Sequence, residues 1–423
     1  MPALSDHPQR FTAANELHAR PFPVIAAPAE VCFFALMPRP GAERGDEGAA
    51  LAALLDHFGA AHPPPASSHH SARIGRFDLK WERHTEFDSY MLISDGAGER
   101  PFDPALIAAF PKQWLAGLSG QAITIISIRV ERLEDDSEVA GKLGRWFVPE
   151  ALACARVLDD SAIVATDFTI DSDRQIRMGL FVRPDTAARR IGRIVQRLTE
   201  IETYKALSML GLFEARALGP DLAGLDGRLG ALVRDMSAGP EESAATLEAL
   251  LRVAADLERI NADLAFRFAA TRAYAALVDQ RITALRETRF TGWQTFDEFM
   301  TRRFDPAMRT VRATEARLAA MADRARRAGE LLRTRVDVQR SAQNQALLAS
   351  MDRRAGLQLR LQETVEGLSV VAISYYAVNL GAYLLAPAGA VAGLPKGALT
   401  ALLTVPVITA VWLLSRRVRR RLR

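Results

Sequence analysis

The sequence predicts an α/β (or α+β) cytosolic domain, followed by a long helical bundle or stalk and a two-helix transmembrane hairpin. Three observations predict this order. Segments rich in β-branched residues lie before about residue 183, apolar residues recur every three or four positions after it, and two uncharged apolar runs stand near the end of the 423-residue chain. We therefore expect seven segments: a cytosolic domain (1–183), a helical domain (184–304), a stalk helix (305–364), a first span (365–386), an outer loop (387–397), a second span (398–415) and a basic cytosolic tail (416–423).

The first domain is predicted to alternate short strands with short helices. Ala122 to Val130 is the clearest strand, because Ile and Thr are enriched there and no helical period is needed. The turn from Asp171 to Arg174 separates two segments that we expect to pair as a hairpin. The full set comprises strands at Val31–Met37, within Arg73–Ser94, at Ala122–Val130, Ser161–Ile170 and Gln175–Val182, and helices at Ala49–Phe58 and from Asp103-Pro104 onward.

Long helices are expected from Asp185. Five apolar residues at helical spacing form one face of the first helix: Ile191, Ile194, Leu198, Ile201 and Tyr204. Gly219-Pro220 is expected to end this helix, because proline removes a backbone donor and clashes with the preceding turn. Pro240 and the two glutamates after it predict the first turn of a second helix, which would reach about Arg289.

The stalk helix is predicted to begin at Asp305-Pro306, where Asp suits the cap and Pro the first turn. No proline follows until Pro387, so an uninterrupted helix of about 80 residues would extend roughly 120 Å. Its apolar residues are sparse among many Arg and Gln. Such a helix is unstable alone, and we expect self-association around a symmetry axis to supply its partners.

Two uncharged runs, Gly367–Ala386 and Ala398–Ser415, are long enough to cross a bilayer as helices. The alternative is a pair of buried helices in a soluble core. The connection between the runs offers only Lys396 as a cation, whereas Arg residues flank both outer ends, so both termini are expected in the cytoplasm. The amino terminus has no signal-peptide core, and the frequent Arg and Ala suggest a bacterial genome. We therefore expect a multi-pass protein of the bacterial inner (plasma) membrane.

Electrostatics point to lipid rather than nucleic acid as the partner of the basic tail. Each arginine near an anionic surface contributes about 1 kcal/mol. The net charge of +4 is otherwise unremarkable, and two cysteines, Cys32 and Cys154, are too few for a disulfide framework. The expected headgroup ligands are Arg416, Arg417, Arg419, Arg420, Arg421 and Arg423.

The order of stalk helix, first span, short outer connection, second span and basic tail is similar to that of CorA-type metal-ion transporters. Those proteins are pentamers whose first span lines the pore and carries a Gly-Met-Asn signature after an aromatic residue. Here Tyr376-Ala377-Val378-Asn379 occupies the comparable region, so Asn is present while Gly and Met are absent. The resemblance implies a homo-oligomer, a pentamer if CorA-like, that conducts a divalent cation.

Polar residues of the first span are the candidates to line such a path. Ser369, Tyr376 and Asn379 are spaced seven and three residues apart and share a helical stripe. Glu366 at the cytosolic mouth would form an acidic ring in an oligomer. The same stripe could instead mediate helix packing, and Glu366 could pair with Arg360 or lie among headgroups.

The whole chain also resembles a proteobacterial family of membrane-anchored proteins known only as a domain of unknown function. Four segments carry this resemblance: Glu16–Phe22, Trp81–Phe87, Gln196–Tyr204 and Val365–Val370. The resemblance supports the expected topology and implies no activity.

A possible polar site lies in two of these segments, and it comprises Glu16, His18, Arg20, Glu82, His84 and Glu86. If residues 81–87 form a strand, Glu82, His84 and Glu86 share one face, as an acid/base or cation site would need. Salt bridges that dock the amino-terminal arm onto the sheet would explain the same residues.

All seven histidines precede residue 85: His7, His18, His57, His62, His69, His70 and His84. Asp56-His57 and the segment with His62, His69 and His70 could hold a borderline metal such as zinc. Their spacing matches no established ligand pattern, and a solvated surface loop explains these residues better. No nucleophile or phosphate-binding motif is present. We therefore expect no enzyme, except for a metal-dependent activity of the amino-terminal domain, and no cofactor other than a divalent cation. The functions that remain are a divergent CorA-like cation conductor and a non-conducting membrane-tethered scaffold or sensor.

Overall fold

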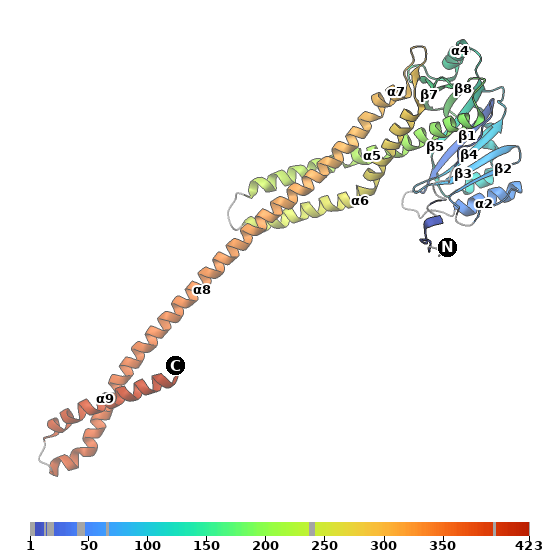
Figure 1. Ribbon diagram of the computed structural model, residues 1–423. Helices are drawn as coiled ribbons and strands as arrows, with labels where there is room; N and C mark the ends of the chain where they lie inside the picture. Colours follow the sequence, from blue (N-terminus) through green and yellow to red (C-terminus); the bar gives the residue numbers. More distant parts are fainter. Residues whose placement is uncertain are drawn as a thin grey trace. The chain divides into compact units, whose positions relative to one another are not determined.

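A nine-stranded sheet forms the centre of the amino-terminal part in the computed structural model (Figure 1). The structure describes residues 5–11, 14, 21–39, 47–64, 67–236, 242–391 and 395–422. The strands are β1 (Ala29–Met37), β2 (His69–Ile74), β3 (Phe77–Arg83), β4 (Asp88–Asp95), β5 (Gln121–Arg132), β6 (Ala153–Val157), β7 (Ala162–Ile170), β8 (Ile176–Val182) and β9 (Thr288–Arg289). The prediction of a mixed α/β domain in the amino-terminal part of the chain is confirmed.

Two antiparallel halves join at one parallel pair in this sheet. The strand order is β2-β3-β4-β1-β5-β8-β7-β6-β9, and β5 and β8 are the parallel neighbours. The first half contains the meander β2-β3-β4, and the second contains the hairpin of β7 and β8 expected across Asp171–Arg174. The parallel pair requires a crossover, which α4 (Asp136–Trp146), β6 and β7 supply.

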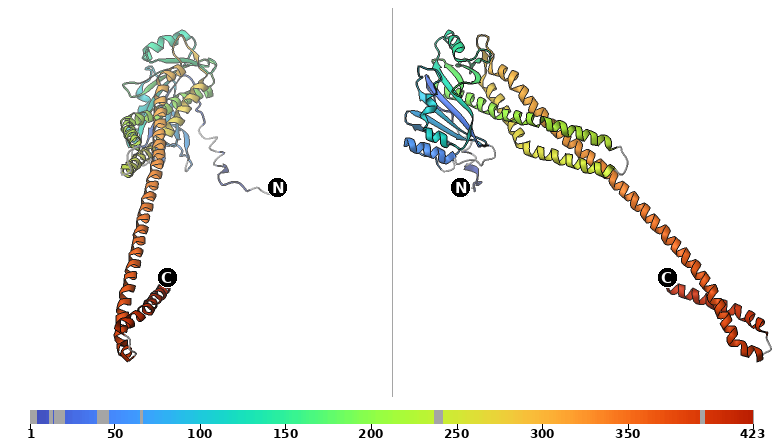
Figure 2. Two further views of the ribbon diagram at one scale, coloured as in Figure 1. Left: turned by 90° about the vertical axis from the view of Figure 1, so that its left-hand side faces the viewer. Right: turned by 180° about the vertical axis from the view of Figure 1, so that it is seen from behind.

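Helices cover both faces of the sheet (Figures 1 and 2). Alternate residues of β1 divide between the faces: Val31 and Phe33 face α5 (Ala188–Asp235), whereas Cys32 and Phe34 face α2 (Glu47–Phe58). The face with α2 also receives the 3-10 helix η1 (Pro104–Ala109) and α3 (Lys112–Gly117), and α4 covers its second half. Burial on both faces explains why β1 is an almost continuous apolar run rather than an alternating one.

The helix expected from Asp103-Pro104 is a short 3-10 helix. The Asp103 carboxylate accepts a hydrogen bond from the backbone N–H of Ala105 at 2.9 Å, so the predicted cap is present. The elements α3, α4, α7 (Phe296–Arg303), β6, β9 and most of β2 were not predicted from the sequence. Strands β6 and β9 are short and depend on pairing with neighbouring strands. Local signals did exist for two helices, namely the Asp135 cap of α4 and the capping box of Thr295 and Glu298 at α7.

The expected end of α5 at Gly219-Pro220 is wrong, since the helix continues through Pro220 to Asp235. Leu218 and Leu222 on either side of the proline are buried. Burial of these leucines therefore outweighs the local cost of proline, which is about 3 kcal/mol in a helix interior.

The second long helix, α6 (Glu242–Leu285), lies beside α5 within the first unit of the chain (Figure 2). The two helices approach so closely that a Cβ at Gly211 would collide with the side chain of Thr271. Leu212, Phe268 and Val311 share an apolar cluster, which joins α5, α6 and the start of α8 (Asp305–Val391). The helix α6 ends at Leu285, before the expected Arg289, because Thr288 and Arg289 pair with β6 as β9.

The chain divides into two compact units, Met1–Arg234 with Ala249–Arg327 and Asp235–Glu248 with Ala328–Arg423. The second unit contains most of α8 and the whole of α9 (Lys396–Leu422). Both helices contain a segment long and apolar enough to cross a membrane. Between residues 333 and 388, where every side chain is described, only Ser374 and Val378 are buried. The structure thus has two candidate membrane-spanning helices.

Glu287 generates a pH prediction, because its carboxylate accepts backbone hydrogen bonds from Phe296 and Asp297 at the start of α7, both at 3.0 Å. Burial raises the pKa of Glu287 from 4.5 to about 7. The folded state therefore binds this proton more tightly than the unfolded chain, and the stabilisation from protonation is fully present below about pH 4.5 and is lost as the pH rises through about 7. We expect Glu287→Gln to flatten this fall, measured as unfolding temperature against pH.

The matched control is Glu134→Gln, which changes an exposed carboxylate. It should leave the pH profile of the full-length protein in detergent unchanged. An unaltered profile in the Glu287 variant would show that this carboxylate does not control stability in that range.

Candidate functional site

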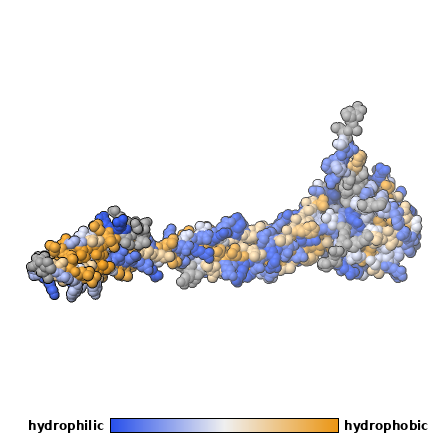
Figure 3. All heavy atoms as spheres, turned by 90° about the horizontal axis from the view of Figure 1, so that it is seen from below, coloured by the Kyte–Doolittle hydropathy of each residue, from blue (hydrophilic) through white to orange (hydrophobic). Residues whose placement is uncertain are grey.

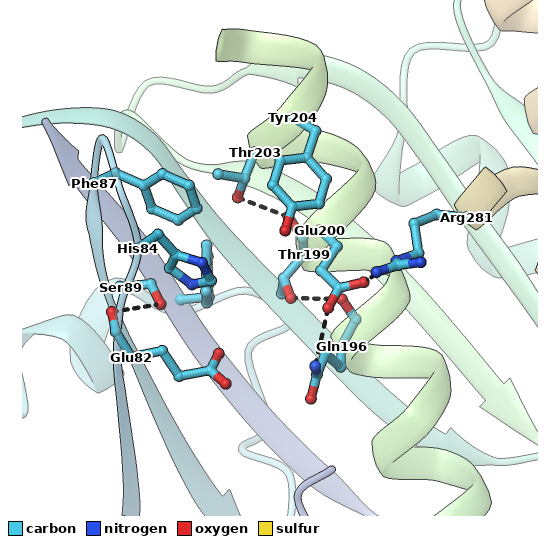
Figure 4. A pocket seen from close by; sticks show the side chains of 11 residues that line it. Glu82, His84, Phe87, Ser89, Gln196, Thr199, Glu200, Thr203, Tyr204 and Arg281 are labelled. Carbon is cyan, nitrogen blue, oxygen red and sulfur yellow. Dashed lines mark hydrogen bonds and ion pairs between the residues drawn. The ribbon is translucent and has the colours of Figure 1, made fainter. Parts of the chain in front are cut away.

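A polar pocket lies between the sheet and the α5–α6 pair in the first unit (Figure 4). Its volume of about 180 Å³ is enough for several water molecules or a small ligand. Strands β1, β3 and β4 form one wall, and α5 and α6 form the other. The lining residues are Phe33, Glu82, His84, Phe87, Ser89, Gln196, Thr199, Glu200, Thr203, Tyr204 and Arg281.

The end of β3 and the turn that follows it bring two predicted residues to this pocket. The expected strand at 81–87 is wrong, because β3 ends at Arg83 and the chain turns before β4. The backbone N–H of His84 donates to the carbonyl of Phe87 at 2.8 Å, and their rings stack at 4.1 Å. Glu82 lines the pocket from the end of β3, and His84 lines it from the turn.

A chain of polar contacts crosses the pocket from the sheet to both helices. The Lys80 ammonium lies 3.0 Å from the Glu82 carboxylate and donates to the Gln196 side-chain oxygen at 2.9 Å. The Gln196 amide donates to Glu200 at 2.9 Å, and Arg281 of α6 donates to the other oxygen of Glu200. These contacts pair both pocket carboxylates with cations, as buried charges require.

Glu82 was predicted from the sequence, whereas the other members of this chain of contacts were not: Lys80, Gln196, Glu200 and Arg281. A partial signal was present, since Gln196 and Glu200 are four residues apart and share one side of a helix. Lys80 gave no such signal. Its side chain is only 5% exposed, which is unusual for lysine, and burial of this kind depends on the fold.

Glu86 lies beside the pocket and contacts α6. Its carboxylate accepts a hydrogen bond from Arg267 at 3.2 Å. Burial, together with the neighbouring Glu86 carboxylate, raises the pKa of Tyr274 above its usual range, and Tyr274 stacks on Tyr204 at 5.5 Å. The carboxylates of Glu82 and Glu86 therefore have different cationic partners and do not form one joint site.

The remaining predicted polar residues are not brought together. Glu16, His18 and Arg20 lie outside the described residues. His62 contacts Asp56 at 2.8 Å, and His70 contacts the Ala61 carbonyl at 3.0 Å. In the part of the chain that the structure describes, no group of three or more His, Cys, Asp or Glu side chains could hold a metal ion.

The candidates in the first apolar segment of α8 divide between two sides of the helix. Glu366 and Ser369 line a groove against the end of α9, and Asn379 lines a second groove with Thr400 and Thr404. Ser369 donates to the carbonyl of Val365 at 2.8 Å. Tyr376 is 72% exposed and lines neither groove. The predicted stripe is therefore split, because α9 covers one of its edges.

The basic tail continues α9 rather than forming a separate segment. The helix runs from Lys396 to Leu422, and the Arg416 guanidinium lies 5.2 Å from the centre of the Trp412 ring. A tryptophan beside arginines at the end of an apolar helix is typical of a membrane interface. Arg423 lies outside the described residues.

Residues 5–422 match the family described as "Protein of unknown function (DUF3422)". The chain belongs to this family. No curated protein and no solved structure matches it. Membership covers the sheet domain, the long helices and both candidate spans together, so the whole chain is one family unit, whose description assigns no activity.

The buried pair of Lys80 and Glu82 generates a stability prediction. Their side chains are 5% and 11% exposed, so Lys80→Met leaves a buried carboxylate without its cation. We expect a loss of about 3 kcal/mol in the free energy of unfolding, measured by denaturant titration of the full-length protein in detergent. Adding Glu82→Gln to this variant should restore most of the loss, because the unpaired charge is then removed.

The control is Arg73→Met on the neighbouring strand, where the partners Arg73 and Asp78 are about half exposed. Its loss should stay below about 1 kcal/mol. Equal losses in the two single variants would show that the Lys80–Glu82 pair is not electrostatically buried.

Proposed function

We propose that this chain is an integral protein of the bacterial inner membrane, held by α8 and α9, whose remaining residues form a self-associating, non-enzymatic cytosolic scaffold or sensor. One observation carries this proposal: the candidate spans are almost wholly exposed, with 11% and 0% of their apolar windows buried. Figure 3 shows hydrophobic side chains gathered over the paired ends of α8 and α9. A soluble protein rarely leaves so large an apolar surface in water.

The flanking charges support an orientation with both ends of the chain in the cytoplasm. Arg353, Arg354 and Arg360 precede the first span, and Arg416 and Arg417 follow the second. The tail arginines would contact anionic lipid headgroups. This orientation keeps the sheet domain and its pocket on the same side as the tail.

The pocket supports a sensing role. It combines a polar hydrogen-bonded wall with the aromatic rings of Phe87 and Tyr204, and it touches strands β1, β3 and β4 and both long helices. A ligand in this pocket would contact α5 and α6 at the same time. If it bound one arrangement of these two helices more tightly than another, it would shift the population toward that arrangement. The paired state of Glu82 and Glu200 favours recognition by hydrogen bonding over acid/base catalysis.

A second candidate function is a cation path similar to that of CorA-type transporters. The observation that favours it is the exposed side of the first span, where Tyr376 stands clear of α9. Around an oligomer axis, Tyr376 would offer its hydroxyl to a partly hydrated divalent cation. Ser369 and Asn379 would contribute oxygen ligands from the edges of the grooves that they share with α9, and Glu366 would attract the cation. Five copies would be present if the likeness to CorA extends to assembly.

Membrane insertion predicts an asymmetric labelling pattern for single cysteine variants. Lys396→Cys should react with a membrane-impermeant maleimide in intact cells, because it lies between the spans. Ser5→Cys and Arg416→Cys should react only after permeabilisation. Cys32 and Cys154 are buried and give little background. Labelling of Arg416→Cys before permeabilisation, with Lys396→Cys protected, would overturn the orientation.

The cation path predicts divalent cation uptake into proteoliposomes, read by a trapped fluorescent indicator. Asn379→Leu should lower the uptake rate about tenfold or more, because it removes a polar group from the path. A tenfold lower rate corresponds to an increase of about 1.4 kcal/mol in the barrier to passage. Leu384→Ala, at an exposed position of the same helix, is the control and should conduct normally. If vesicles that contain the folded native protein take up no divalent cation, the cation path is overturned and the scaffold or sensor remains the proposed function.

A further inference from the structure

An exposed heptad pattern follows α8 into its apolar segment. Two series of residues, each spaced by seven and offset by four, define what we call the α8 seam: Leu347, Arg354, Leu361 and Leu368, and Met351, Gln358, Val365 and Ala372. All eight are exposed, and the five large apolar members are 56 to 70% exposed. This alternation of three and four residues places them in one stripe, as in coiled coils.

Charged residues avoid the neighbourhood of the α8 seam. The residues directly beside it are uncharged: Leu348, Ser350, Ala355, Leu357, Gln362 and Thr364. Between residues 345 and 372, the charges outside the seam lie on the opposite side of the helix, at Asp352, Arg353, Arg360, Glu363 and Glu366. Arg354 is the one charge in the seam. An isolated solvated helix has no reason to segregate its charges in this way.

The helix α9 does not cover the α8 seam. Its contacts bury Ser374 and Val378, which lie two and six residues after Ala372, and hence about 200° and 240° around the helix axis. The seam is therefore on the far side of α8 from α9. Upstream, every residue from 340 to 365 except Ser350 is exposed, so this stretch has no other packing partner within the described chain. In proteins, most of the stability of a helix comes from the packing of its apolar face, so the exposed apolar residues of this stretch need a partner.

We propose that the α8 seam is the interface between parallel copies of this chain. This inference rests on the proposed membrane orientation and self-association, and it names the surface that joins the copies. Copies inserted into one membrane with the same topology must run α8 in the same direction. Each copy then presents Leu361, Val365 and Leu368 at the same distance from the membrane surface, so apolar layers meet apolar layers.

Arg354 and Gln358 form one polar layer within this interface. In an aligned parallel assembly, the Gln358 side-chain oxygen can accept from Arg354 of a neighbouring copy, and both groups are satisfied only in that register. A polar residue at a coiled-coil core position commonly sets register and oligomer number at some cost in stability. Glu366 lies on the charged side of α8, so it faces away from the axis of this assembly.

Cysteine cross-linking of the full-length protein in its membrane tests the interface. Leu347→Cys and Leu361→Cys should each form covalent dimers on oxidation or with a short bismaleimide. Leu359→Cys is the matched control, since Leu359 and Leu361 are 63% and 70% exposed but lie on different sides of α8. It should link at least about fivefold less, because only contacts within a few ångströms allow a short bridge.

The outcomes separate this inference from the proposed self-association. Positions 347 and 361 are about 21 Å apart along the helix, so an antiparallel pair can link at no more than one of them. Linking at only one position, or equally at 359, overturns the parallel seam. A stable oligomer whose mass is unchanged by Leu361→Asp would also overturn it while leaving self-association intact. A monomer in mild detergent and in native membranes would overturn both the α8 seam and the proposed self-association.

Discussion

The contact between α5 and one face of the sheet is the interaction on which the rest of the first unit depends. Ile191, Ile194, Leu198 and Ile201 of α5 meet the alternate apolar residues of the central strands, and the end of α6 and the start of α8 join the same core. The chain that leads into β1 also packs closely on α5, because a Cβ at Gly192 would collide with the carbonyl of Pro23. Burial of this apolar surface is the main stabilising term, and it determines where the polar side of α5 must lie.

The polar pocket follows from that placement. Gln196 and Glu200 lie between the apolar residues of α5 and so reach the edge of the same interface, where Lys80 and Arg281 meet them. Charged groups at such an edge are stable only when each has a partner, and the chain of contacts from Lys80 to Arg281 provides them. The pocket therefore joins the sheet to both long helices through side chains of limited solvent access.

The second unit obeys a different constraint, because only Ser374 and Val378 are buried between residues 333 and 388, where every side chain is described. The amphipathic distribution of charge along α8 continues to Glu366, and beyond it the helix is uncharged on every side. Water would suit the charged side of α8, a neighbouring copy would suit the α8 seam, and lipid would suit the uncharged segment after Glu366. The proposed anchor and the α8 seam account for the exposed apolar residues with two kinds of partner, namely lipid for the spans and a second copy for the stripe upstream.

Local patterns determined much of this protein. Local sequence patterns predicted the order of sheet domain, long helices and two apolar helices, since β-branched runs, helical periodicity and uncharged stretches are properties of neighbouring residues. The paired strands β7 and β8 and the beginning of α8 at Asp305 followed from turn and capping residues. Tertiary contacts decided the rest. Helix α5 passes through Pro220 because flanking leucines are buried, β9 exists only by pairing with β6, and residues 84–87 turn because β3 and β4 pair around them. The partners of Glu82 were beyond sequence reasoning for the same physical reason, since Gln196 lies 116 positions from Lys80 and such proximity arises only when the sheet and helices pack together.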